Sequence, residues 1–98
     1  MQTDEKQFYV YIMTNKVNTV LYTGVTSDLQ ARVYQHKEGL TPGFSKRYRV
    51  YKLVYYEEVA DALSAIACEK QIKAGTRKKK LELVNRMNPQ WLDLYELL

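Results

Sequence analysis

The chain has 98 residues, which is enough for one small domain and too few for two. It is 46% hydrophobic and 27% charged, as in ordinary globular proteins, which argues against global disorder. One cysteine and one histidine exclude an intrachain disulfide framework and a zinc site built from several Cys and His ligands. We expect a cytoplasmic protein without membrane contact, because no apolar stretch approaches the roughly 20 residues that span a bilayer.

The positive charge is concentrated in two segments of the chain. The formal net charge is +4, a mild bias towards polyanionic partners. Residues 46–52 contain four Lys or Arg, and residues 70–80 contain six Lys or Arg and no acid. Such a run is usually a solvated helix face, but it can also follow a nucleic-acid backbone by neutralising phosphates.

The first half of the chain begins with a predicted β-hairpin. Residues 8–13 are β-branched and aromatic, and residues 20–25 resume this pattern after a turn. A loop centred between Lys16 and Val17 would place Tyr11 opposite Tyr22. One face of the hairpin would then carry Tyr9, Tyr11, Tyr22 and Gly24, and the other would carry Phe8, Val10, Ile12, Leu21 and Val25. The second set is typical of a core, whereas the glycine in the first set permits a close approach.

A helix follows the hairpin. Ser27 and Gln30 have the spacing of a capping box, which predicts a helix to about Lys37. Arg32 and His36 would lie together at the edge of its apolar stripe. A charge beside a packed face is costly unless an anion meets it, so this pair is a candidate anion-binding element.

The next elements are a strand over 50–57 and a helix that Asp61 caps and Gly75 ends. Glu69 would project from the apolar side of that helix. On its own, a glutamate at this position is more often the partner of a lysine four residues further on, here Lys73.

Two more helices complete the predicted fold. Thr76 can cap a helix over 77–86, and Asn88-Pro89 has the order of an N-cap and first residue of a last short helix. The order β-β-α-β-α-α-α predicts an α+β domain over residues 1–98, with a three-stranded, largely antiparallel sheet flanked by helices.

The chemistry-bearing residues occur in an order that resembles the GIY-YIG nuclease superfamily. They are Tyr9-Val10-Tyr11, Tyr22-Thr23-Gly24, Arg32, His36 and Glu69. The resemblance extends from about Phe8 to Glu69, and the remaining segment resembles the tail of small stand-alone bacterial members. Either tripeptide alone would be weak support, whereas the ordered set is specific.

This resemblance implies an endonuclease that hydrolyses phosphodiester bonds in DNA with the help of a divalent cation, usually Mg²⁺. It implies that Glu69 holds the metal ion, and that Tyr11 is the general base or positions the attacking water. Tyr22 would hydrogen-bond the phosphate or the water, Arg32 would pair with the phosphate, and His36 would assist proton transfer or hold the phosphate. No appended sequence-reading domain accompanies the motifs, so we expect low-specificity or structure-dependent cleavage, with a protein partner or homodimer as a possible source of specificity.

The basic segments then become candidate nucleic-acid contacts. The residues predicted for this role are Lys46, Arg47, Lys70, Lys73, Arg77, Lys78, Lys79 and Lys80.

Departures from the family motifs support an alternative function. Tyr9 stands at the first motif's glycine, Thr23 at an aliphatic position of the second motif, and Val25 where many members have lysine. A non-catalytic nucleic-acid-binding module on the same scaffold is therefore a second hypothesis. A protein-interaction domain is a third, and it would require an exposed apolar patch. Tyr11 and Tyr22 could also be no more than a stabilising cross-strand pair.

Overall fold

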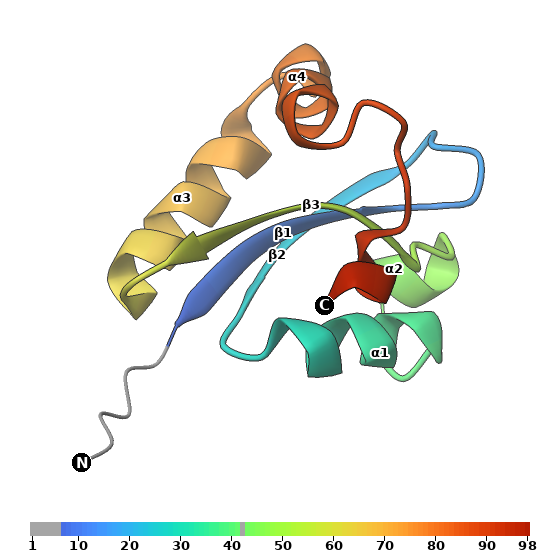
Figure 1. Ribbon diagram of the computed structural model, residues 1–98, viewed down its shortest axis with the longest axis horizontal. Coiled ribbons are helices and arrows are strands. Elements are labelled where there is room, and N and C mark those ends of the chain that lie inside the picture. Colours follow the sequence, from blue (N-terminus) through green and yellow to red (C-terminus); the bar gives the residue numbers. More distant parts are fainter. Residues whose placement is uncertain (1–6, 42) are drawn as a thin grey trace.

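Three antiparallel strands form the middle layer of the computed structural model, which describes residues 7–41 and 43–98 (Figure 1). The strands are β1 (Phe8–Thr14), β2 (Leu21–Thr26) and β3 (Lys52–Val59). Their order is β2-β1-β3, so the first strand is central and the second is an edge strand. The predicted α+β class with a three-stranded antiparallel sheet is confirmed.

The hairpin register differs from the predicted one by two residues. Tyr11 pairs with Gly24, and Tyr22 pairs with Met13, so the predicted pairing of Tyr11 with Tyr22 is wrong. The loop is longer than predicted because the Asn15 side chain accepts hydrogen bonds from the backbone N–H groups of residues 19 and 20, at 2.8 and 3.1 Å. Since side chains alternate with a period of two, this shift leaves every residue on its predicted face.

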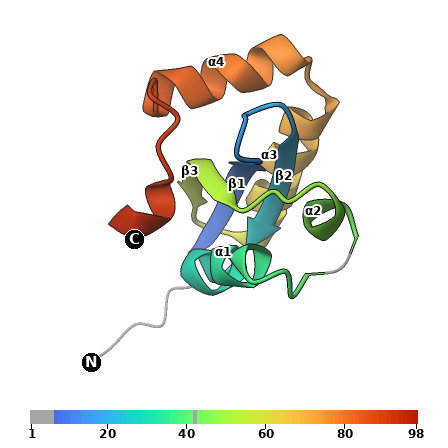
Figure 2. The same ribbon diagram turned by 90° about the vertical axis from the view of Figure 1, so that its right-hand side faces the viewer.

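Helices cover both faces of the sheet (Figures 1 and 2). On one face lie α1 (Leu29–Lys37) and the short 3-10 helix η1 (Leu94–Leu97); on the other lie α3 (Ala62–Ala74) and α4 (Arg77–Met87). A one-turn helix, α2 (Phe44–Arg47), lies in the connection between α1 and β3 and was not predicted. No helix in the described ranges is long and apolar enough to cross a membrane.

The core has one cluster on each side of the sheet. The cluster beneath α1 and η1 contains Tyr11, Met13, Leu29, Val33, Val50, Leu53 and Leu94. The cluster beneath α3 and α4 contains Ile12, Val54, Tyr55 and Val84. The alternation along β1 decides which side each residue joins, as the strand pattern predicts.

Side-chain caps start the helices. Asp28, not the predicted Ser27, caps α1, and its carboxylate accepts a hydrogen bond from the Ala31 N–H at 3.1 Å. Asp61 and Thr76 cap α3 and α4 as predicted. Both residues 27 and 28 are good capping types, and the sequence spacing alone did not separate them.

Asn88 ends a helix, whereas the sequence predicted that it begins one. Its N–H donates to the Val84 carbonyl at 2.7 Å, which makes it the C-cap of α4. Its buried amide nitrogen donates to the carbonyls of Val54 and Leu92, and its oxygen accepts from the Leu92 N–H. The last short helix starts later, at the cap Asp93. Asn88 therefore joins α4, β3 and the C-terminal segment.

Replacing Asn88 with alanine should destabilise the protein by about 2 kcal/mol, because buried carbonyls lose their donor. Urea unfolding followed by circular dichroism measures this change as a lower midpoint at an unchanged slope. The matched control is Asn85→Ala on the same helix, where an exposed asparagine accepts a hydrogen bond from Trp91. Equal losses in the two variants would contradict the assigned role of Asn88.

Candidate active site

Three of the predicted site residues are in direct contact beneath α1. The Tyr11 hydroxyl lies 3.0 Å from Nε2 of His36, and the Tyr11 side chain is fully buried. The ring centres of Tyr11 and Tyr22 are 6.3 Å apart, and those of Tyr22 and His36 are 5.2 Å apart. The two tyrosines therefore lie close together, but diagonally across the strands and with the histidine ring against both.

Gly24 makes room for the Tyr11 ring. A Cβ atom at this position would overlap the phenol oxygen and the ring carbon that bears it. The sequence predicted that a group would approach this glycine closely. That group is the phenol of Tyr11, which pairs with Gly24 across the strands. Because of this glycine, the Tyr11 hydroxyl lies over the edge strand β2.

Arg32 and Glu69 act on the same phenol from two different elements. Arg32 lies one turn before His36 on α1, and its hydrogen bond and charge lower the pKa of Tyr11. Glu69 belongs to α3 on the other face of the sheet, yet its carboxylate is close enough for its charge to raise the pKa of Tyr11. The structure thus places Tyr11, Tyr22 and His36 in contact, with Arg32 and Glu69 near enough for their charges to shift the pKa of the Tyr11 phenol.

The Glu69 carboxylate also forms an ion pair. Its Oε2 lies 2.7 Å from Nζ of Lys73, four residues further along α3. The glutamate side chain is only 12% exposed, whereas the lysine side chain is 54% exposed. The ion pair with Lys73 that the helical spacing predicted for Glu69 is therefore present. Glu69 forms it while its charge also acts on Tyr11. The exposed lysine can move away without exposing the core.

Burial keeps the Tyr11 phenol protonated. Desolvation is the largest cause that raises its pKa to about 12, the Tyr22 phenol adds to it, and Arg32 offsets part of the shift. At neutral pH the hydroxyl is therefore a hydrogen-bond donor, and an added positive charge would be needed for it to act as a base.

His36 is neutral at neutral pH. Burial, with the Arg32 charge as a second cause, lowers its pKa to about 4. A neutral imidazole has one donor nitrogen and one acceptor nitrogen. Its Nε2 meets Tyr11, and its Nδ1 lies 3.1 Å from the Thr41 hydroxyl. The sequence contained no signal for Thr41, which lies in the loop after α1.

A single carboxylate limits which metal ion this site suits. The described residues contain no group of three or more His, Cys, Asp or Glu that could hold a metal ion. Mg²⁺ keeps several water ligands and is commonly held by one or two carboxylates together with substrate phosphates. Glu69 fits that role as the one protein ligand of a cation shared with substrate, whereas zinc requires more protein ligands.

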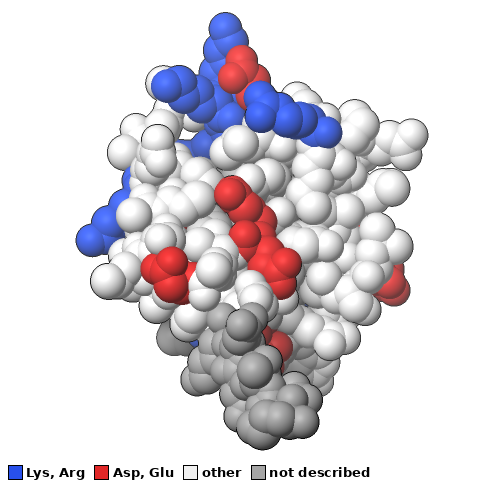
Figure 3. Space-filling view, turned by 60° about the vertical axis from the view of Figure 1, so that its left-hand side comes forward, with Lys and Arg blue, Asp and Glu red and all other residues white. Residues whose placement is uncertain are grey.

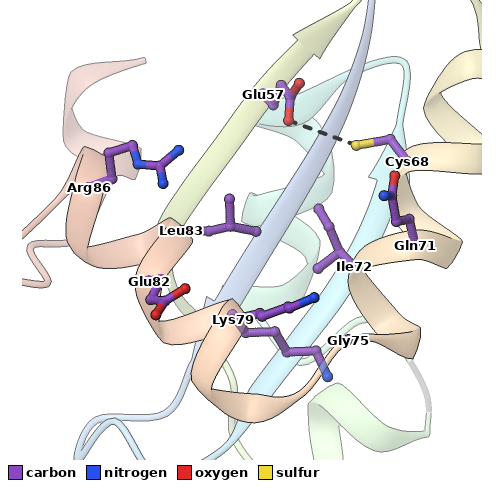
Figure 4. Close-up of a pocket in the computed structure, with 10 residues that line it drawn as sticks. Glu57, Cys68, Gln71, Ile72, Gly75, Lys79, Glu82, Leu83 and Arg86 are labelled. Carbon is purple, nitrogen blue, oxygen red and sulfur yellow. Dashed lines mark hydrogen bonds between the residues drawn. The ribbon is translucent and has the colours of Figure 1, made fainter.

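The predicted nucleic-acid contacts do not form one surface. Lysine and arginine side chains gather at the α4 end of the molecule, and carboxylates form a separate group below them (Figure 3). Lys79 and Lys80 line a hollow of about 460 Å³ between α3, α4 and β3 (Figure 4). Lys46 lines a different hollow, of about 300 Å³, which His36 also borders. Lys70, Arg77 and Lys78 are exposed on α3 and α4.

Comparison with known proteins identifies the protein family to which this chain belongs. A sequence profile described as the GIY-YIG catalytic domain matches residues 7–82, so the chain belongs to the GIY-YIG family. The UPF0213 protein SH2523 of Staphylococcus haemolyticus is 37% identical over 76 residues, covering 78% of this chain and 92% of the relative. A UPF0213 protein of Pediococcus pentosaceus is 33% identical over 79 residues, covering 81% and 82%. The chain is thus similar to small UPF0213 members of that family.

A solved structure agrees with this assignment. The solution NMR structure of the UPF0213 protein BH0048 from Bacillus halodurans matches with a TM-score of 0.57 at 26% sequence identity. The match covers 93% of this chain and 96% of that protein. The fold is therefore shared over almost the whole length of both chains.

The titration of His36 tests the buried geometry. It is the only histidine, so its ring carbon gives a single, unambiguous NMR signal. We expect a titration midpoint near pH 4, well below the ordinary value of 6.5. Because the unfolded chain binds the proton more tightly, the protein should lose stability as pH falls from about 6.5 to 4. A midpoint near 6.5 would show that the ring is not buried against Tyr11.

Proposed function

We propose that this protein is a divalent-metal-dependent endonuclease that hydrolyses phosphodiester bonds in DNA. The observation that supports this most strongly is the contact among Tyr11, Tyr22 and His36, with Arg32 and Glu69 near enough for their charges to shift the pKa of Tyr11. They supply a carboxylate, a guanidinium, an imidazole and two hydroxyls. Phosphoryl transfer chiefly needs such positioning and charge stabilisation. Membership of the GIY-YIG family favours the same reaction.

Arg32 and Tyr22 have the chemistry to bind the phosphate. The guanidinium stays charged and can make two parallel hydrogen bonds to phosphate oxygens, which stabilises the charge of the transition state. The Tyr22 hydroxyl, beside the Tyr11 and His36 rings, can donate to the phosphate or to the attacking water. A Mg²⁺ ion held by Glu69 would polarise the phosphate and stabilise the leaving oxygen.

Tyr11 is the group in this proposal that orients the water and, once its own proton has been lost to solvent, takes a proton from that water. With a pKa of about 12, its phenol holds its own proton until positive charge arrives. Arg32 already lowers that pKa, and a cation on Glu69 would lower it further. Neutral His36 fixes the phenol's orientation through the 3.0 Å contact with Nε2.

The alternative is a binding module without turnover. Val25 stands where many family members have lysine, and Glu69 is already paired with Lys73. A module of this kind would bind nucleic acid in a salt-sensitive way and leave it intact. Low-specificity or structure-dependent recognition of DNA is part of the nuclease proposal, with a protein partner or homodimer as a further source of specificity.

Cleavage of labelled DNA in the presence of Mg²⁺ separates the two functions. The panel should contain duplex, nicked, branched and single-stranded substrates. Glu69→Gln should lower the rate at least a hundredfold, because it removes the anionic ligand while keeping the side-chain size. The matched control is Glu82→Gln, an exposed carboxylate on α4. Intact DNA across the panel, or equal rates for the wild type and Glu69→Gln, would favour the binding module.

The pH dependence of single-turnover cleavage tests Tyr11 as the base. Below a pKa near 12 the phenolate fraction grows with pH, so the rate should rise about tenfold per unit between pH 7 and 9. If a bound cation lowers the pKa of Tyr11, the cleavage rate should stop rising at a lower pH. Tyr11→Phe should remove most activity and the slope. A wild-type rate that is flat over this range would contradict the role as base.

A further inference from the structure

A second hollow lies beside the candidate site, at the C-terminal end of α1. Its volume is about 300 Å³, at the lower end of the range for small-ligand sites. His36 and Gly39 line it from the α1 side, and Lys46, Arg49 and Tyr51 line it from the segment before β3.

Two cations enter this hollow from one tight turn. The Arg49 N–H donates to the Lys46 carbonyl at 3.3 Å, which closes the turn and brings both side chains to the same wall. Arg49 has a backbone φ of 56°, a left-handed conformation that is uncommon for residues other than glycine. Glu38 adds one negative charge to the lining, and Lys37 is engaged in an ion pair with Asp93. The pair Lys46 and Arg49 suits a single phosphate.

Exposed aromatic rings alternate with these cations. Tyr48 is 43% exposed and Tyr51 is 38% exposed. The Arg47 guanidinium lies 5.6 Å from the centre of the Tyr48 ring. Proteins that bind single-stranded nucleic acid combine positive grooves with aromatic rings on which bases stack. Residues 46–51 have that combination.

The hollow and the candidate site share one residue, the buried His36. This residue touches Tyr11 and Tyr22 with its ring and also lines the hollow. From Arg32 to Lys37, where α1 ends, the helix rises by about 7.5 Å, at about 1.5 Å per residue. A strand whose phosphate meets Arg32 can therefore place a neighbouring nucleotide in the hollow.

We propose that this hollow binds one unpaired nucleotide next to the cleaved bond, with its base against Tyr51 and its phosphate between Lys46 and Arg49. The position relative to the cleaved bond rests on the proposed nuclease function. A base inside a duplex has both faces covered by its neighbours, so only an unstacked base can lie on the tyrosine ring. The substrate is then DNA with a single-stranded segment at the cleavage position.

Binding measurements without cleavage test this subsite. Fluorescence anisotropy in EDTA compares a labelled single-stranded oligonucleotide with the same sequence in a duplex. Tyr51→Leu should weaken single-strand binding about tenfold or more, as the loss of one stacked base does, and leave duplex binding unchanged. Tyr51→Phe should retain binding because it keeps the ring. The matched control is Tyr34→Leu, an exposed tyrosine of α1 that does not line this hollow.

The contribution of the Lys46 and Arg49 charges to binding is measured separately, through the salt dependence of the affinity. Lys46→Gln with Arg49→Gln should reduce the slope of log affinity against log salt for the single strand by about 0.7, as expected for the loss of one neutralised phosphate. Lys16→Gln, in the exposed hairpin loop, should leave the slope unchanged. Thermal melts confirm that each variant is folded.

The outcomes separate this subsite from the nuclease proposal. A Tyr51→Leu effect no larger than that of Tyr34→Leu, or an equal loss on duplex DNA, would overturn the subsite. Tyr51-dependent binding without any cleavage by the wild type would keep the subsite and remove the nuclease. Cleavage that depends on Glu69 and not on Tyr51 would keep the nuclease proposal and remove the subsite.

Discussion

One buried hydrogen bond, between the Tyr11 hydroxyl and His36, holds the candidate site together. It joins the central strand to α1 at 3.0 Å, in surroundings where an unpaired polar group is costly. The phenol can occupy this place only because Gly24 has no side chain. The close packing of ring, glycine backbone and imidazole therefore fixes the hydroxyl in position before any substrate binds, which is the condition for catalysis by positioning.

Burial sets the resting charge of this pair. It raises the pKa of Tyr11 to about 12 and lowers that of His36 to about 4, so both are neutral over the whole physiological range. The charges near them are those of Arg32 and Glu69, which come from different elements. A site of this kind contains almost no phenolate to act as a base at neutral pH until a cation arrives and lowers the phenol pKa. The same burial that stabilises the fold would thus restrain the proposed hydrolysis until metal and phosphate are both present.

Local patterns predicted the fold well where one physical signal dominated. The strand faces were correct despite a register error of two residues, because alternation survives an even shift. The grouping of Tyr11, Arg32 and Glu69 was expected from the ordered motif, although their roles are still proposals. Asn88 was misplaced because asparagine suits either end of a helix, and its buried bonds to Val54 and Leu92 are long-range contacts that spacing does not encode. The partnership of Thr41 with His36 was out of reach for the same reason.

The sheet separates the two groups of basic residues. Lys79 and Lys80 border a hollow between α3, α4 and β3 (Figure 4). Lys46 and Arg49 border the hollow at the C-terminal end of α1, which His36 also lines. Electrostatic effects between exposed charges fade beyond about 10 Å at 0.1 M salt. Of these two groups, the one beside His36 is therefore the better placed to orient a phosphate near Arg32. In the proposed function, the cations of α4 attract a long polyanion to the molecule, so general attraction and local positioning belong to different faces.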